Sequence, residues 1–276
     1  MLPDRQLIES DARRALAEDV GGGDLTAGLV AGESQVCAHL ICRKAAVLSG
    51  IAWVDEVFAQ VDAKVELQWS LADGDLMQDG QLVCVIKGKA ASILTAERAG
   101  LNFLQTLSGT ATLTASYVQV VQGLKVNILD TRKTIPGLRL AQKYAVTCGG
   151  GVNHRMGLYD AILIKENHIA AAGSIAAVLQ QAHTQHPDVP IEIEVETLDE
   201  LKRALDAGAQ RILLDNFNLE QLREAVNVNQ GQARLEASGG VNIDTIRAIA
   251  ETGVDDISVG AITKDLQAAD FSLLFV

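Results

Sequence analysis

Apolar and polar residues follow different spacings in the two halves of the chain. Residues 4–18 carry apolar side chains at helical spacing and three glycines, 21–23, follow, so the pattern predicts a helix that ends at the glycines. Between about residues 36 and 86 the pattern changes to short β-like runs separated by Asp-Gly turns, which predicts antiparallel strands. The clearest runs are 38–42, 65–69 and 82–86.

A helical pattern follows these strands. It covers residues 91–107, and Ser108-Gly109 is expected to break it before a second helix that continues to Gln122. Beyond Gly123 the chain alternates six strand-like runs with helical patterns. The runs are 125–130, 161–165, 190–196, 211–215, 234–238 and 256–260.

Strands that alternate with helices imply parallel pairing through right-handed crossovers. A full (β/α)8 barrel has eight strands, so six strands predict an incomplete α/β barrel, with an open doubly wound sheet as the alternative. Residues 191–196 read Ile-Glu-Ile-Glu-Val-Glu, which places three glutamates on one face of the strand. Helices cover the outside of a barrel, so this face should point inward. An edge strand with a solvated acidic face is the other interpretation.

Composition and charge narrow the possible partners. A chain of 276 residues with 48% hydrophobic and 21% charged residues is typical of a soluble globular protein. A net charge of −12 argues against nucleic acid, which is held mainly by Lys and Arg. The apolar runs are too short for a membrane span, and the first residues lack the apolar core of a signal peptide. With four cysteines and no Cys-x-x-Cys pair, we expect a cytoplasmic protein with reduced thiols.

Residues 130–168 depart from this acidic composition. They hold six Lys or Arg against three Asp or Glu, which predicts a pocket for a small anion with several charges. In a parallel barrel the catalytic groups gather at the carboxyl ends of the strands, and here every predicted strand ends on charged or small residues. These ends are Asp130 with Arg132 and Lys133, Lys165, Glu194 with Glu196, Asp215, Ser238-Gly239-Gly240 and Val259-Gly260-Ala261.

The last two strand ends have the features of a phosphate site. Ser238-Gly239-Gly240 leaves backbone N–H groups uncovered before a helix expected to begin near Asn242, and Gly260 does the same after the final strand. Barrels commonly place phosphate at their last two loops. Tight packing between strand and helix is the other explanation for these glycines.

The charged strand ends allow several interpretations. Glu194 and Asp215 suit Mg²⁺, which takes few protein ligands and completes its shell with phosphate oxygens and water, or they form ion pairs with Lys165 or Arg132. Lys165 ends an apolar strand and could be a Schiff-base nucleophile or a fixed cation. Arginine recognises carboxylates in a bidentate manner, and the candidates are Arg132, Arg155 and Arg98, although Arg98 beside Glu97 also fits an exposed helical pair.

Several longer motifs carry a family resemblance. They include Glu18-Asp19-Val20-Gly21, Asp130-Thr131-Arg132-Lys133-Thr134, Gly149-Gly150-Gly151 with Asn153-His154-Arg155, Leu163-Ile164-Lys165-Glu166-Asn167-His168, Leu214-Asp215-Asn216-Phe217 and Ile257-Ser258-Val259-Gly260-Ala261. In these segments, and over nearly its whole length, the chain resembles the quinolinate phosphoribosyltransferases. The resemblance implies an N-terminal α/β sandwich domain over 1–110 and an incomplete, six-stranded α/β barrel over 111–267, with 268–276 returning to the first domain.

The resemblance also implies an activity. A pentosyltransferase of NAD synthesis would convert quinolinate and phosphoribosyl pyrophosphate, with Mg²⁺, to nicotinate mononucleotide, pyrophosphate and CO2. Family active sites are completed by the N-terminal domain of a partner subunit, which implies a homodimer with shared sites, brings in Arg98 of the other subunit, and leaves a hexamer open.

The resemblance assigns roles residue by residue. The catalytic set is Lys133, Lys165, Glu194 and Asp215, with Glu194 and Asp215 as the Mg²⁺ ligands. Lys133 would neutralise the departing pyrophosphate. Quinolinate would be bound by Arg98, Arg132, His154, Arg155 and Lys165, and the 5′-phosphate by Ser238, Gly239, Gly240, Val259, Gly260 and Ala261. Thr131 is a further substrate-binding residue.

Three alternatives share parts of this site. A phosphoribosyltransferase-like protein associated with molybdenum transport has the same fold, but Gly149-Gly150-Gly151 with Asn153-His154-Arg155 favours the quinolinate enzymes. An aldolase-type barrel would use Lys165 as a Schiff base. A non-catalytic anion-binding protein would have no need of the complete set of carboxylates and cations.

Overall fold

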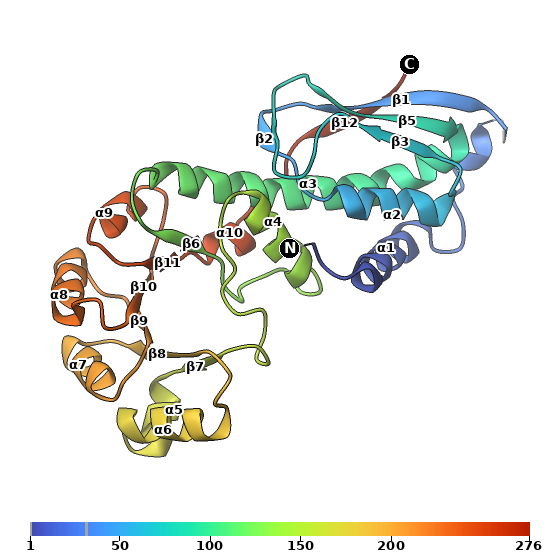
Figure 1. Ribbon diagram of the computed structural model, residues 1–276. Coiled ribbons are helices and arrows are strands. Elements are labelled where there is room, and N and C mark those ends of the chain that lie inside the picture. The colour runs from blue at the N-terminus through green and yellow to red at the C-terminus, as the bar shows by residue number, and fades with distance from the viewer. Residues whose placement is uncertain (1, 31–32) are drawn as a thin grey trace. The chain divides into compact units, whose positions relative to one another are not determined.

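The computed structural model describes residues 2–30 and 33–276, which form two compact units (Figure 1). Unit 1 contains the described residues up to Ala115, together with Ile135–Gly150 and Asp265–Val276. Unit 2 contains Ser116–Thr134 and Gly151–Lys264. The class is the expected mixture of α and β structure, with an antiparallel sheet in unit 1 and a six-stranded parallel sheet in unit 2.

Unit 1 is built on a four-stranded antiparallel sheet in the order β12-β1-β5-β3. Its core lies between this sheet and helices, where Leu40 and Ile86 of the sheet join Trp53 and Leu104 of the helices in one buried cluster. Its elements are α1 (Arg5–Val20), η1 (Ala27–Leu29), β1 (Gln35–Cys42), β2 (Ala46–Val47), α2 (Ile51–Val61), β3 (Glu66–Trp69), β4 (Leu76–Met77), β5 (Leu82–Lys89), the first part of α3 (Ala90–Val120), α4 (Arg139–Cys148) and β12 (Phe271–Phe275).

The predicted break at Ser108-Gly109 is wrong, because α3 continues from Ala90 to Val120. These two small residues permit close packing within unit 1. The Ser108 hydroxyl accepts from the Ser49 N–H at 3.0 Å, and a Cβ on Gly109 would lie 2.2 Å from the Gln267 carbonyl oxygen. Glycine inside a helix costs about 1 kcal/mol relative to alanine, and here tertiary contacts offset that cost.

Two segments join unit 1 from far along the chain. Residues 135–150 were expected in the barrel, but Ala141 and Ala145 of α4 lie in the core of unit 1, and the Tyr144 hydroxyl donates to Asp73 Oδ2 at 2.8 Å. The apolar face of this short helix therefore decides where it packs. At the carboxyl terminus, β12 pairs antiparallel with β1, so that Phe275 lies opposite Ala38.

Unit 2 is built on six parallel strands in the order β6-β11-β10-β9-β8-β7, which agrees with the six predicted runs. Helices line one side of this curved sheet in Figure 1, so the fold is an incomplete barrel and not a doubly wound sheet. The elements are β6 (Asn127–Leu129), β7 (Ile162–Ile164), α5 (Glu166–Ala172), α6 (Ile175–Gln185), β8 (Ile191–Val195), α7 (Leu198–Asp206), β9 (Arg211–Asp215), α8 (Leu219–Asn229), β10 (Arg234–Ser238), α9 (Ile246–Ala250), β11 (Asp256–Ser258) and α10 (Ala261–Lys264).

Glu192 and Glu194 of β8 lie on the enclosed face of the curved sheet, as predicted. Neighbouring strands flank β8 on both sides, so it is not an edge strand, and Glu192 is 5% exposed. Glu196 lies beyond the strand end and is exposed. The four cysteines are free thiols, and among the described residues no helix has the combination of length and apolar character that crossing a bilayer would need.

Candidate active site

Lys165 and Glu194 form an ion pair where β7 and β8 end. The Lys165 Nζ lies 2.5 Å from Glu194 Oε2, and the Glu194 side chain is only 10% exposed. Such charge-assisted hydrogen bonds are short and are strengthened by the exclusion of water. The ion pair that the sequence left as an alternative for Glu194 is therefore present.

Asp215 is held at the end of β9 by the residue that follows it. Asn216 Nδ2 donates to Asp215 Oδ2 at 2.7 Å. The backbone N–H of Asn216 donates to the Ser238 carbonyl at 2.9 Å. Asn216 adopts a left-handed backbone with φ of 57°, and a Cβ on Gly239 would lie 2.1 Å from its Oδ1. The close approach of Asn216 therefore requires glycine at position 239.

The glycine loop after β10 differs from the prediction in one respect. Gly239 and Gly240 have positive φ values of 97° and 61°, so the loop turns sharply after Ser238. The following helix begins at Ile246 and not near Asn242, whose side chain instead accepts the N–H groups of Asp244 and Thr245 in a turn. The dipole of a five-residue helix that begins six residues after Gly240 adds little to a phosphate site. The donors that this loop offers are therefore the backbone N–H groups of the exposed Gly239 and Gly240.

Lys133 lies against the loop that follows β11. A Cβ on Gly260 would lie 3.0 Å from Lys133 Cδ, so the bare backbone of the glycine makes room for the lysine stem. The Lys133 N–H donates to Thr131 Oγ1 at 3.1 Å, and the Thr263 hydroxyl donates to the Lys133 carbonyl at 2.7 Å. These contacts bring Thr131, Lys133 and the segment 259–261 together, as the sequence predicted.

Arg155 reaches the same end of unit 2 by an unusual route. Val152 pairs in parallel with Leu129, and its carbonyl accepts the Asp130 N–H at 3.2 Å. Because the chain then continues in the direction of β6, Arg155 lies beyond the carboxyl end of that strand. Burial lowers the pKa of Arg155, and the positive charge of Arg132 nearby lowers it further.

The two guanidinium groups lack the usual carboxylate partners. Arg132 Nε is buried with no hydrogen-bond partner. In the part of the chain that the structure describes, neither the Arg132 nor the Arg155 guanidinium forms an ion pair with a carboxylate. Two neighbouring cations that repel each other and are partly desolvated favour an anionic ligand.

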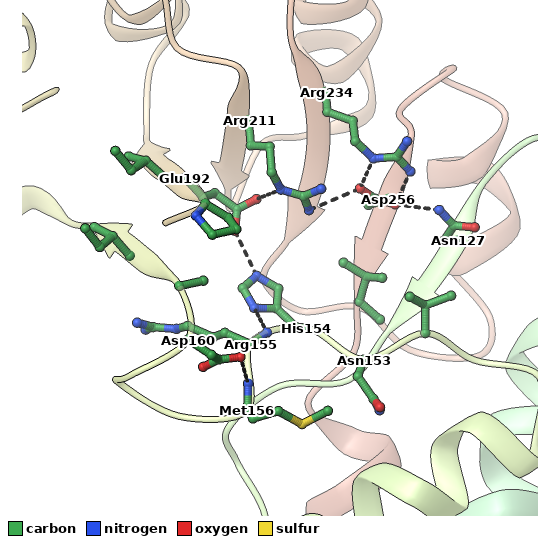
Figure 2. Close-up of a pocket in the computed structure, with 16 residues that line it drawn as sticks. Asn127, Asn153, His154, Arg155, Met156, Asp160, Glu192, Arg211, Arg234 and Asp256 are labelled. Carbon is green, nitrogen blue, oxygen red and sulfur yellow. Dashed lines mark hydrogen bonds and ion pairs between the residues drawn. The ribbon is translucent and has the colours of Figure 1, made fainter. Parts of the chain in front are cut away.

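His154 is bonded to the protein through both ring nitrogens (Figure 2). Nε2 lies 2.8 Å from Glu192 Oε2 and 3.3 Å from Glu236 Oε2, and the Arg155 N–H donates to Nδ1 at 2.7 Å. Burial acts to lower the pKa of His154, but the two glutamates raise it to about 9, so the cluster carries an extra proton at neutral pH. Burial also raises the pKa of Glu236, so His154 and Glu236 share their protons as a coupled pair.

These three side chains also have the composition of a metal site. Their ligand atoms lie within 4.8 Å of one another. However, the Arg211 guanidinium already lies 3.6 Å from Glu192 and 3.9 Å from Glu236. A permanent cation therefore balances these carboxylates, and the cluster is best understood as an internal charge network.

A cavity of about 600 Å³ is lined by residues near the amino ends of the strands, such as Asn127 and Arg234, and by the loop that carries His154 and Arg155 (Figure 2). Asp256 dominates its chemistry, because Arg234 binds both carboxylate oxygens at 2.7 Å and Asn127 donates to Oδ1 at 2.9 Å. Burial acts to raise the pKa of Asp256, but these hydrogen bonds hold it below its ordinary value. The charges of Asp256, Arg234 and Arg211 are thus satisfied within the protein.

The predicted residues divide between the two units. Arg98 is exposed on α3 in unit 1, whereas every other predicted residue belongs to unit 2. Sequence reasoning gave no site role to Glu192, Glu236 or Asp160. A signal existed for Glu236, since one acid stands within the apolar run of β10, but its partner His154 lies 82 positions earlier and no spacing rule connects them.

Both halves of the chain match one protein family. Residues 24–108 match the N-terminal domain of quinolinate phosphoribosyl transferase, and residues 110–274 match the C-terminal domain. The nicotinate-nucleotide pyrophosphorylase (carboxylating) of Mycobacterium leprae is 41% identical over 270 residues, which cover 95% of this chain and 94% of that protein. A probable enzyme of the same name from Bacillus subtilis is 40% identical over 257 residues, which cover 93% and 89% of the two chains.

Solved structures give the same result. The nicotinate-nucleotide pyrophosphorylase of Francisella tularensis superimposes with a TM-score of 0.97 at 46% identity and covers 99% of this chain and 98% of that one. Two matching domain descriptions, relatives of 40% and 41% identity and this superposition all agree with the motifs and the fold. The chain therefore belongs to the quinolinate phosphoribosyl transferase family.

Proposed function

We propose that this protein transfers the phosphoribosyl group of phosphoribosyl pyrophosphate to quinolinate and releases pyrophosphate and CO2, which yields nicotinate mononucleotide for NAD synthesis. The names of its relatives support this reaction. The observation that carries it is the pair of neighbouring guanidinium groups, Arg132 and Arg155, that have no carboxylate partner in a protein of net charge −12. A pyridine dicarboxylate is an anion of the size and charge that such a pair binds.

Different groups would bind the carboxylates of quinolinate, the pyrophosphate and the 5′-phosphate. Arg132 and Arg155 would bind carboxylates of quinolinate, with Thr131, His154 and Lys165 as further contacts. Lys133, which lies on Gly260, would neutralise the departing pyrophosphate. The backbone of Ser238-Gly239-Gly240 and Val259-Gly260-Ala261 would bind the 5′-phosphate through N–H groups.

Glu194 and Asp215 are the proposed Mg²⁺ ligands. Two carboxylates at the ends of adjacent strands fit a cation that keeps several waters and phosphate oxygens in its shell. When bound, Mg²⁺ would neutralise charge on the pyrophosphate group. The ion pair with Lys165 orients the Glu194 carboxylate at this edge of the sheet.

The chemistry follows from the distribution of charge. The ring nitrogen of quinolinate forms a bond to C1 of the ribose as the bond from C1 to the pyrophosphate oxygen breaks. Positive charge develops on the ribose, and fixed carboxylates and phosphate-binding groups stabilise it by position. The ring nitrogen is then a pyridinium, which accepts the electron pair left when the 2-carboxylate departs as CO2, and a proton takes its place.

We further propose a homodimer in which Arg98 of one subunit completes the active site of its partner, with a hexamer as an untested higher assembly. The exposed position of Arg98 on α3 is compatible with this arrangement. Arg98→Ala should be inactive alone and should regain activity when its subunits are mixed with those of Lys165→Ala, because one hybrid site is then intact. Inactive mixtures that demonstrably contain heterodimers would contradict the shared site.

The reaction itself is tested with purified protein, quinolinate, phosphoribosyl pyrophosphate and Mg²⁺. We expect nicotinate mononucleotide and CO2 in equal amounts, no turnover with EDTA, and none with nicotinate in place of quinolinate. No turnover, together with no shift of the melting temperature by quinolinate, would refute the proposed substrate. An adduct trapped at Lys165 by borohydride with a carbonyl substrate would instead support the aldolase alternative, which the 2.5 Å ion pair to Glu194 disfavours.

A further inference from the structure

The loop that carries Arg155 is fixed in an uncommon way. Residues 153–157 form neither helix nor strand, and yet four successive backbone N–H groups, 154 to 157, are each accepted by a side chain within unit 2. Surface loops usually leave such groups to water. Four successive donors bound by protein side chains restrict the conformation of this loop, which holds a proposed substrate-binding arginine.

Asp130 fixes the beginning of the loop. It follows β6, is fully buried, and accepts the His154 N–H at Oδ1 at 2.9 Å and Asn153 Nδ2 at Oδ2 at 2.6 Å. Two hydrogen bonds to one buried carboxyl group hold this segment in place. The end of a core strand thus determines where His154 and Arg155 begin.

The His154 imidazole fixes the middle of the loop. Its Nδ1 accepts the N–H of Arg155, and its Nε2 is bonded to Glu192 of β8. Glu192 and Glu236 are 5% and 1% exposed, so they form a rigid support for the ring. Through this ring the backbone of Arg155 is tied to β8 and β10.

Asp160 fixes the end of the loop, as Figure 2 shows. Its Oδ2 accepts the Met156 N–H at 2.7 Å and its Oδ1 accepts the Gly157 N–H at 2.9 Å. The turn is so tight that a Cβ on Gly157 would lie 2.4 Å from the Tyr159 ring. The Asp160 charge also acts on Arg155 and opposes the repulsion from Arg132.

We propose that Asp160 and Asp130 are positioning residues that hold the Arg155 guanidinium beside Arg132, ready to bind a carboxylate of the acceptor substrate; this rests on the proposed function. Two guanidinium groups repel each other, so a loose loop would let Arg155 move away from Arg132 before the ligand arrives. Holding Arg155 in place before binding removes that reorganisation from the binding step.

Asp160→Asn tests this proposal in the full-length protein. The amide keeps the size of the carboxylate, but its NH2 group would face an N–H donor, so one of the two loop contacts is lost. We expect the KM for quinolinate to rise about tenfold, as a small displacement of a binding group can produce, while kcat and the KM for phosphoribosyl pyrophosphate change less than about twofold. Asp188→Asn, which removes an equal charge from an exposed position of unit 2, should leave all three unchanged.

A double-mutant cycle separates positioning from general structural damage. If Asp160 acts through Arg155, Asp160→Asn should change quinolinate affinity little in a protein that already carries Arg155→Ala. Additive losses in the double variant, or equal effects of Asp160→Asn on both substrates, would overturn the proposal. A wild-type protein that turns over another acceptor but not quinolinate would refute the proposed function first, and would be recognised before any variant is made.

Discussion

Arginine side chains at the two ends of the parallel sheet differ in what surrounds them. At the amino ends, Arg234 binds both oxygens of the buried Asp256, and Arg211 lies within 3.6 Å of Glu192. Beyond the end of β6, the positive charge of Arg132 acts on Arg155, neither guanidinium forms an ion pair among the described residues, and Arg132 Nε is buried with no hydrogen-bond partner. Arg234 and Arg211 therefore stabilise the fold, whereas Arg132 and Arg155 are available to bind an anionic ligand.

This comparison predicts its largest effect at Arg132. Arg132→Ala should lower kcat/KM for quinolinate by about 10²–10³, or roughly 3–4 kcal/mol, as for loss of one preorganised charged donor. The melting temperature should stay constant or rise, because the repulsion of Arg155 is relieved. Steady-state kinetics and thermal unfolding of the same preparation measure both, and near-normal kcat/KM would remove Arg132 from the site.

The opposite result is expected at Arg234. Arg234→Met leaves the buried Asp256 without its bidentate partner, although Arg211 and Asn127 still contact it. We expect the free energy of unfolding to fall by about 2–3 kcal/mol, below the range for a fully buried pair because Arg234 is 43% exposed. The kcat of the folded protein should be preserved, and a variant that is stable but inactive would break the distinction between the two ends.

The cluster of His154 with Glu192 and Glu236 predicts that the stability of the fold depends on pH. The pKa of His154 is raised from its ordinary 6.5 to about 9, and that of Glu236 is also raised, so the folded state binds more protons than the unfolded state in this range. Stability should therefore fall as pH increases from 6.5 to 9, by at most about 3 kcal/mol. Glu236→Gln imitates the protonated carboxyl, so its melting temperature should decline less over this range than that of the wild type.

The smallest effect is expected for an exposed pair. Arg203 and Asp199 on α7 lie 3.0 Å apart with side chains 58% and 79% exposed. Arg203→Ala should change the free energy of unfolding by less than about 0.5 kcal/mol and leave kcat/KM unchanged. A larger change measured by denaturant unfolding would show that exposure does not separate these classes of arginine.

Regular spacing made much of this architecture predictable from the sequence. The runs at 211–215 and 234–238 agree with β9 and β10 residue for residue, because a short, mostly apolar run bounded by polar residues marks each strand locally. The strand ends also located the ion pair of Lys165 with Glu194.

Contacts between distant segments set the limit of that prediction. Ser108-Gly109 has the composition of a helix end, but contacts with Ser49 and Gln267 keep α3 continuous. The placement of α4 in unit 1 likewise depends on which core its apolar face reaches. No local pattern could show that Asp160 binds the loop of Arg155, or that Glu236 lies behind His154.

The central claim is that Arg132 and Arg155 together recognise a dicarboxylate. Calorimetric titration of quinolinate and nicotinate, with and without Mg²⁺ and pyrophosphate, tests it on the wild type and on Arg132→Ala and Arg155→Ala. The account predicts that the wild type binds quinolinate far more tightly than the monocarboxylate and that either substitution removes most of this preference. Equal binding of the two acids by the wild type, or an unchanged preference in both variants, would contradict it.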